Sequence, residues 1–433
     1  MMKLESDDND HDIGVKLNKE LRRRKINVTK VVCAFGLVLF LITGNFSFIH
    51  KPMKLWNCID NSSVYALGPN SIPSGAKYAP SEFVDNGYLK EPYLIIDGNE
   101  IPVRDIISSS SHNLFLTYNN DIYGCGHNGR MQMYTNSKKS FSDLEEVTKL
   151  SIPNAGNPKF KLASSGTDFS ICITDDNKMF ASGVNYSGQC GIGSSKPQFM
   201  AMIDYESQLL SLDPNSNCEI IEIHSNDNST IFRTSEGKLY GFGNHSYGCF
   251  GLGEDIEREN HEICRVGSGS KEFMKEKCIS FSCGMFFVCA ITESNHLYAF
   301  GYNNCHQLSA KDLHTVYTPV KINLTDCLSN NASNIPGYSG LVSSVVCGGY
   351  STFALSMDNK IYITGYFKSD DIIKSFKCLT EFELESKTPI QMSNGDFHSA
   401  ILVKYDYISH LFPRLSTLLQ IAYLSDVCFH FDC

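Results

Sequence analysis

The sequence predicts an all-β protein, a β-propeller built from repeats of close to 58 residues. First, the chain contains 21 Tyr, 27 Phe and 32 Gly but only 19% charged residues, and aromatic side chains suit pleated sheets while glycine allows tight reversals. Second, a glycine that ends a strand-turn-strand pattern recurs every 57 to 64 residues. Third, apolar residues alternate within each pattern, which is the period of a strand and excludes a helical solenoid.

Each repeat contains a short pattern that predicts a β-hairpin. An alternating apolar run, a polar cluster and a second alternating run follow one another, as in LFLTYNNDIYGCG at 114–126. This is the order of strand, turn and strand in a hairpin. An aromatic residue lies three positions before the final glycine, and in most repeats a Thr or Ser lies nine before it. The glycines that end the hairpins are Gly68, Gly126, Gly183, Gly243, Gly301 and Gly365.

A second small position lies eight residues before the Thr or Ser of several repeats. Glycine occupies it at Gly166, Gly284 and Gly348, and Gly395 holds the corresponding place near the C-terminus. A small or φ-permissive residue lets an inner strand start where several blades converge near the central axis. Because one hairpin is only marginally stable in water, we expect the blades to stack radially and to close into a ring with short, protected edges.

The repeats resemble those of the regulator of chromosome condensation family over most of residues 55–404. The family pattern includes a Tyr-x-(Trp/Phe)-Gly-x-Asn loop followed by Gly-Gln-Leu-Gly, and its best instances here are FASGVNYSGQCGIG at 180–193 and YGFGNHSYGCFGLG at 240–253. The Gly-x-Asn element also occurs at Gly68/Asn70, Gly126/Asn128 and Gly301/Asn303. The resemblance implies a propeller, and the founding member of the family exchanges guanine nucleotide on a small GTPase of the Ran type.

The chain departs from the family pattern in two ways. The strand histidine of the family remains only as His112 and His398, which we interpret as core residues that hydrogen-bond a neighbouring strand. Trp56 is the only tryptophan, so a tryptophan-based light sensor like the plant UV-B photoreceptor is excluded. The resemblance lies in blade-forming positions, so it assigns no residue of this chain to nucleotide exchange.

The number of blades stays open between six and seven. At 58 residues each, residues 55–404 favour six, with the strands of 390–403 completed by SVYALG at 63–68 as a clasp. If residues 50–59 form inner strands of their own, seven blades result. The tail at 405–433 has Leu415, Leu418, Leu419 and Ala422 at helical spacing, which predicts a helix docked on the propeller.

The N-terminal region predicts a polar, basic tail at 1–30 and a possible transmembrane signal-anchor at 31–49. The run VVCAFGLVLFLI is apolar, and about 20 such residues in a helix cross a bilayer. Arginines and lysines precede the run, so the positive-inside rule predicts a single-pass membrane protein with a cytosolic N-terminus. A cleaved signal peptide and a buried strand in a soluble cytoplasmic or nuclear protein are the alternatives.

The sequence predicts no catalytic, cofactor or metal site. It lacks Cys-x-x-Cys, HExxH and GxSxG, the spacings of common zinc and hydrolase sites. We interpret Cys283, Cys347 and the strand cysteines as small buried thiols, with a disulfide that involves Cys428 or Cys433 as the alternative. A net charge of −10 without a folded basic stripe makes nucleic acid an unexpected partner.

The sequence therefore predicts a non-enzymatic scaffold that binds a protein partner. Loops on a rigid framework are the usual place of binding, and the segments that vary between repeats are 135–159, 194–219, 254–277, 309–343 and 368–389. The alternative function is nucleotide exchange on, or regulation of, a small GTPase. The membrane is expected as a partner only through residues 31–49.

Overall fold

The fold is given by a computed structural model. It describes residues 27–34, 37–43, 64–67, 93–96, 99–109, 111–134, 144–152, 156–193, 198–254, 259–310, 314–324, 340–358, 360–367, 371–378, 387–394, 399–405, 417–420, 422–423 and 427–428. The described residues are almost entirely β-strand and short connections. The prediction of an all-β protein is confirmed.

The strands form antiparallel sheets in chain order. The first sheet contains β1 (Asn27–Ala34), β2 (Leu37–Thr43) and β3 (Val64–Leu67). The second contains β4 (Tyr93–Ile96), β5 (Asn99–Ser108), β6 (His112–Thr117), β7 (Ile122–Gly126) and β8 (Leu144–Lys149). The third contains β9 (Phe160–Ser165), β10 (Phe169–Thr174), β11 (Met179–Gly183) and β12 (Gln198–Ile203).

Three further sheets have four strands each, and the last two sheets have three and two strands. They contain β13 (Ile220–Ser225), β14 (Ser229–Thr234), β15 (Leu239–Asn244) and β16 (Glu259–Arg265), then β17 (Cys278–Cys283), β18 (Phe287–Thr292), β19 (Leu297–Tyr302) and β20 (Thr315–Ile322). There follow β21 (Val342–Cys347), β22 (Ser351–Ser356), β23 (Ile361–Phe367) and β24 (Asp371–Cys378), and finally β25 (Lys387–Asn394), β26 (Ser399–Tyr405) and β27 (Thr417–Gln420), with a separate pair of β28 (Ala422–Tyr423) and β29 (Val427–Cys428). Among the described residues, one short α-helix, α2 (Tyr205–Leu212), lies outside the sheets.

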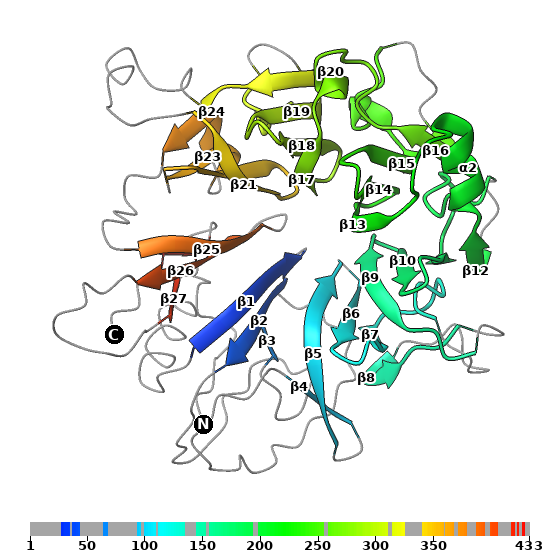
Figure 1. Cartoon of the computed structure of the whole chain (residues 1–433). Helices are drawn as coiled ribbons and strands as arrows, with labels where there is room; N and C mark the ends of the chain where they lie inside the picture. Colours follow the sequence, from blue (N-terminus) through cyan, green and yellow to red (C-terminus); the bar gives the residue numbers. More distant parts are fainter. Residues whose placement is uncertain are drawn as a thin grey trace, which may run out of the picture.

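The sheets are arranged as a ring around a common centre (Figure 1). Strands β5, β9, β13, β17 and β21 lie towards the centre, and the last strand of each sheet lies at the outside. Strand β1 contacts β25 and β26 on one side and β5 on the other, so the first sheet stands between the second and the last. Within the described residues, seven sheets of three or more strands therefore follow one another around the ring.

The predicted hairpins are present and share one register. The repeat glycine pairs with the first residue of the preceding strand in five sheets: His112 with Gly126, Phe169 with Gly183, Ser229 with Gly243, Phe287 with Gly301, and Ser351 with Gly365. The Thr or Ser nine residues before the glycine closes the turn, since the Thr174 hydroxyl accepts the Lys178 backbone N–H at 2.9 Å. These residues are nearly solvent-free, with Thr174 1% and Ser356 0% exposed.

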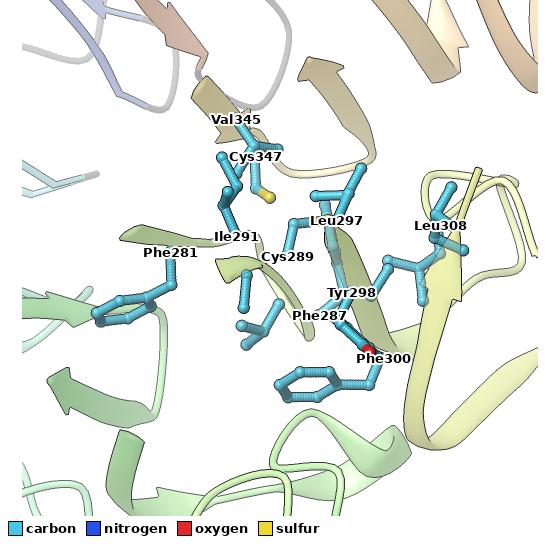
Figure 2. Close-up of a cluster of buried hydrophobic side chains, with 14 of the residues drawn as sticks. Phe281, Phe287, Cys289, Ile291, Leu297, Tyr298, Phe300, Leu308, Val345 and Cys347 are labelled. Atoms are coloured by element: carbon cyan, nitrogen blue, oxygen red, sulfur yellow. The ribbon is translucent and has the colours of Figure 1, made fainter. Parts of the chain in front are cut away.

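The core lies between neighbouring sheets and is made largely by the aromatic repeat position. Tyr240, Tyr298 and Tyr362 are each no more than 1% exposed. One large cluster joins β17–β20 to both neighbouring sheets, with Phe287, Phe300 and Leu308 packed beside Tyr298 (Figure 2). Burying such side chains contributes about 1.5–3 kcal/mol each, which explains why a hairpin that cannot stand alone is stable within the ring.

The N-terminal segment differs from the prediction of a membrane-spanning helix. Residues 27–34 and 37–43 form two antiparallel strands, β1 and β2, with Val31 opposite Phe40 and Ala34 opposite Leu37. The run is rich in Val, Ile and Phe, which favour strands, and Gly36 falls between the two halves. In the part of the chain that the structure describes, no helix is long and apolar enough to span a membrane.

The two predictions made for the end of the propeller are wrong. SVYALG does not complete the strands of 390–403, because β3 pairs with β2 and β26 pairs with β27. The tail is not helical where helical spacing was found, since Leu418 and Leu419 lie in β27 opposite Val403 and Leu402. An unpaired edge of β26 offers hydrogen bonds along a whole strand, and this outweighs the local spacing of the leucines.

Candidate interaction face

The strand order brings two connections of each sheet to the same end. In an antiparallel four-strand sheet, two connections lie at the same end of the strands. They are the connection between the first and second strands and the connection between the third and fourth. We call this end of the propeller the loop face. The remaining hairpin turns, such as the one at Tyr118 between β6 and β7, lie at the opposite end.

One backbone hydrogen bond fixes the two connections of a sheet against each other. The residue after the repeat glycine donates its N–H to the carbonyl of the residue just before the second strand, at 2.9–3.0 Å. We call these two residues the loop pair. The loop pairs are Ser111/His127, Asp168/Val184, Asn228/Asn244, Phe286/Tyr302 and Tyr350/Tyr366.

The repeat glycine makes this close approach possible. Gly126, Gly183, Gly243, Gly301 and Gly365 have φ between 96° and 115°, a region that L-residues with a side chain rarely adopt. A Cβ atom on Gly183 would also lie 2.3 Å from the Asp168 carbonyl oxygen, and one on Gly301 would lie 2.5 Å from that of Phe286. Glycine is required here by both backbone conformation and space.

The second set of glycines is explained by crowding alone. A Cβ atom on Gly166 would lie 2.0 Å from the Phe169 ring, and one on Gly284 would lie 2.1 Å from the Phe287 ring. The N–H of Gly348 donates to the Ser351 carbonyl at 2.9 Å, the same bond that Gly166 and Gly284 make in their sheets. Gly68 and Gly395 lie outside the described residues.

The Asn of the Gly-x-Asn motif is structural. The side-chain oxygen of Asn128, Asn185 or Asn303 accepts the N–H five residues later at 2.8–2.9 Å. A glutamine follows four residues after this asparagine. Its side-chain oxygen accepts a backbone N–H of the same loop, as Gln189 does from Ser187 at 2.9 Å. The motif therefore holds the long loop in shape and offers no chemistry.

His112 behaves as predicted. It is 1% exposed, and its Nε2 lies 2.7 Å from the Ser170 hydroxyl of the neighbouring sheet. Burial, with a smaller contribution from His127, lowers the pKa of His112 to about 3. His112 is thus a neutral bridge between blades rather than a proton-transfer group, and His398 lies outside the described residues.

Three consecutive sheets, β4–β8, β9–β12 and β13–β16, have polar residues at every loop-pair position except Val184, and we call this part the polar sector. Its side chains bond to one another across sheets: the Ser111 hydroxyl donates to the Thr167 carbonyl, and the Thr167 hydroxyl donates to Asp227 Oδ1 at 2.8 Å. Gln189 Nε2 donates to Asn228 Oδ1 at 3.2 Å. Burial and the nearby Asp168 raise the pKa of Asp227.

The sheet β17–β20 presents aromatic residues at the same positions. Tyr247, from the loop of the preceding sheet, lies with its ring centroid 5.3 Å from Phe286 and 5.0 Å from Tyr302. We call Tyr247, Phe286 and Tyr302 the aromatic sector. Tyr247 is 48% exposed and has φ 61°, an uncommon value for a residue with a side chain. The next loop pair, Tyr350/Tyr366, is aromatic as well.

The cysteines agree with the prediction of buried thiols. The cysteines whose side chains the structure describes form no disulfide; Cys347 is buried and Cys283 is partly buried. Burial raises the pKa of the Cys283 thiol well above its ordinary value, so it stays protonated and unreactive. No cluster of metal-ligating side chains is found among the described residues.

Comparison with known proteins agrees with this geometry. The family model of the regulator of chromosome condensation (RCC1) repeat matches residues 278–307, which cover β17, β18, β19 and the Asn303 loop. The human regulator of chromosome condensation is 24% identical over 274 residues, 60% of this chain and 59% of that protein. The chain is a divergent RCC1-like protein.

Solved structures support the same architecture. Human WBSCR16 matches with a TM-score of 0.63 and 18% identity over 88% of this chain and 87% of that one. Prp20p from Saccharomyces cerevisiae matches with a TM-score of 0.58 and 15% identity over 85% and 80%. The chain spans 59% of the length of the human and Xenopus laevis regulators that it matches, so this RCC1-like protein shares their fold, and their activities are not carried over.

Proposed function

We propose that this RCC1-like protein is a non-enzymatic scaffold that binds a protein partner through the loop face. The observation that carries the proposal is the aromatic sector. Clustered aromatic residues are enriched where proteins bind one another. Tyr247 is 48% exposed and contacts the half-buried Phe286 and Tyr302, and Tyr302 lies between the repeat glycine Gly301 and Asn303. A preformed surface loses little conformational entropy when it binds.

Affinity purification with matched variants tests this proposal. The double variant Tyr247→Ser, Tyr302→Ser removes two rings of the aromatic sector. Tyr118→Ser removes an exposed ring, 51% accessible, at the opposite end. We expect the double variant to lose partners that the wild type and Tyr118→Ser both capture. An unchanged set of partners in the double variant would contradict the use of this face.

The second candidate is nucleotide exchange on a small GTPase. Its support is the fold shared with Prp20p, whose binding to Gsp1p and to histones has been studied together with its structure. A nucleotide-release assay with Gsp1p or another Ran-type GTPase tests it directly, and an unchanged release rate would count against exchange. Exchange also requires the propeller and the GTPase to share a compartment, so protease protection of residues 99–378 in intact membranes would rule out exchange on a cytosolic GTPase.

We also propose that the ring closes with seven blades rather than the six that its length favours. The position of β1–β3 between β25–β27 and β4–β8 supports seven. Deleting residues 27–43 would then remove a blade and open the ring, so thermal unfolding should lose cooperativity. A truncated chain that unfolds like the full chain would argue for six.

A further inference from the structure

We propose that the aromatic sector binds an arginine side chain presented by an exposed, positively charged peptide segment of the partner. The proposal rests on the function proposed above, because it names the chemistry that the loop face recognises. It is carried by the arrangement of Tyr247, Phe286 and Tyr302, by the conformation of Tyr247 and by the charges that surround the sector.

The fold does not require aromatic residues in the aromatic sector. The loop pairs Asp168/Val184 and Asn228/Asn244 make the same backbone bond as Phe286/Tyr302, at 2.9–3.0 Å. In the polar sector Gln189 Nε2 donates to Asn228, whereas the equivalent atom of Gln307 is buried without a partner in the described structure, beside the sheet in which Tyr350 replaces the asparagine. The aromatic half of the face thus forgoes a hydrogen bond that the polar half makes.

Tyr247 is held in a conformation that its own backbone disfavours. Its φ of 61° is left-handed, and the following Gly248 is left-handed too, with φ 73°. In the other described loops, the residue equivalent to Tyr247 is not left-handed. Only the next residue, equivalent to Gly248, has a positive φ, as at Met131 and His306. Such a conformation is energetically unfavourable in a bulky residue. With this backbone conformation, the ring of Tyr247 packs against Phe286 and Tyr302.

A second contact orients Tyr302. Asn304 donates from Nδ2 to the Tyr302 hydroxyl at 3.0 Å, and Asn304 Oδ1 lies 3.0 Å from Nδ1 of His314. The Tyr247 ring meets Phe286 at an interplanar angle of 57° and Tyr302 at 64°. Rings inclined in this way form the walls of a corner, and aromatic faces attract cations through their quadrupoles.

The charges of the loop face favour a cation over an anion. Among the described residues of its connections, the acidic groups are Asp168, Asp227 and Glu254, and Arg130 is the basic one. Arg130 belongs to the sheet β4–β8, and the sheets β9–β12 and β13–β16 separate it from that of Tyr302. Arginine fits better than lysine because its planar guanidinium stacks on aromatic rings and is more weakly hydrated. Among the described residues of these connections, only Arg130 carries a side chain that would attract an acidic segment, and it lies away from the aromatic sector.

The test measures peptide binding to the full chain by fluorescence anisotropy. The probe is a labelled peptide of Gly-Arg-Gly-Ser repeats, and its control has citrulline, a neutral isostere, in place of each arginine. We expect the arginine peptide to bind at least about tenfold more tightly than the citrulline peptide. Equal affinity of the two peptides would overturn the proposal.

Matched tyrosine variants separate the aromatic contact from general attraction of charge. Tyr247→Leu keeps an apolar side chain and every charge but removes the ring, and we expect about a fivefold loss of affinity for the arginine peptide. Tyr186→Leu, at a 59% exposed tyrosine of the preceding loop, is the control and should bind like the wild type. Unchanged binding by Tyr247→Leu would overturn the proposal, since charge alone would then explain the affinity.

The outcome is distinguishable from failure of the proposed function. If Tyr247→Ser, Tyr302→Ser loses its partners while the arginine peptide binds Tyr247→Leu normally, the loop face is an interaction surface but arginine is not its ligand. If the double variant keeps its partners, the interaction face itself is wrong.

Discussion

The polar and aromatic sectors occupy equivalent positions on one rigid frame, and they differ in what satisfies their side chains. Thr167, Asp227 and Asn228 bond to neighbouring sheets of the same ring. The Tyr247 ring contacts those of Phe286 and Tyr302, and Tyr247 remains 48% exposed. The frame is therefore set by residues that repeat, and the recognition that we propose would be carried by residues that differ between repeats.

If the two sectors share one frame, removing a repeat glycine should damage both equally. Gly183→Ala and Gly301→Ala each place a methyl group within 2.5 Å of a carbonyl oxygen at positive φ. We expect a loss of about 3 kcal/mol or more in the free energy of unfolding for each, measured by urea denaturation. Gly156→Ala, at φ 72° with no atom within 4 Å of the added Cβ, should lose only about 1 kcal/mol.

The loop asparagines offer a second comparison of the sectors. Asn185 and Asn303 are 0% and 1% exposed, and each accepts one buried backbone N–H. Replacing either by Ala leaves that N–H without a partner, which costs about 1–3 kcal/mol. Thermal unfolding of Asn185→Ala and Asn303→Ala should show similar losses. A much smaller loss for Asn303→Ala would mean that the aromatic sector is held by its rings and not by the frame.

His112 belongs to the polar sector and should make stability depend on pH there. Because the folded pKa is about 3 and an unfolded histidine titrates near 6.5, the unfolded chain binds a proton between these values that the folded chain does not. The free energy of unfolding should fall as pH decreases from 6.5 towards 3, by up to about 1.4 kcal/mol per pH unit from this group.

The variant His112→Gln isolates this contribution from that of the carboxylates. The glutamine would keep a side chain able to bond Ser170 but could not titrate. We expect the variant to be less stable than the wild type at pH 7, with the difference narrowing as the pH falls towards the folded pKa of His112. A difference that stays constant with pH would show that His112 is protonated equally in both states.

The repeating part of the molecule could be predicted from sequence, and the non-repeating parts could not. The hairpins and their glycines depend on local patterns that recur, and the bridging role of His112 could be predicted from the family resemblance. The pairing of β1 with β2 and of β26 with β27 depends on which strand edge is available in the assembled ring, and a local pattern does not contain that information. Helical spacing of Leu418 and Leu419 was therefore misleading.

The aromatic sector was also missed, although a signal for it exists in the sequence. Aligning the repeats on their glycines places Phe286 and Tyr350 in the column of Ser111, Asp168 and Asn228. The change from polar to aromatic down one column marks the boundary between the sectors. Tyr247 gives no such signal, because its exposure depends on a left-handed backbone that only the coordinates reveal.

The variant Tyr247→Gly has the smallest predicted effect on stability. It tests whether Tyr247 is needed to hold the loop or to bind a partner. Tyr247→Gly removes the strain of a bulky residue at φ 61° and also the contacts with Phe286 and Tyr302, so the free energy of unfolding should change by less than about 1 kcal/mol. Binding of the arginine peptide should nevertheless fall by about fivefold or more. Denaturation and anisotropy on the same sample measure both. A large destabilisation would instead place Tyr247 in the frame, since the ring would then be needed to hold the loop rather than to meet a partner.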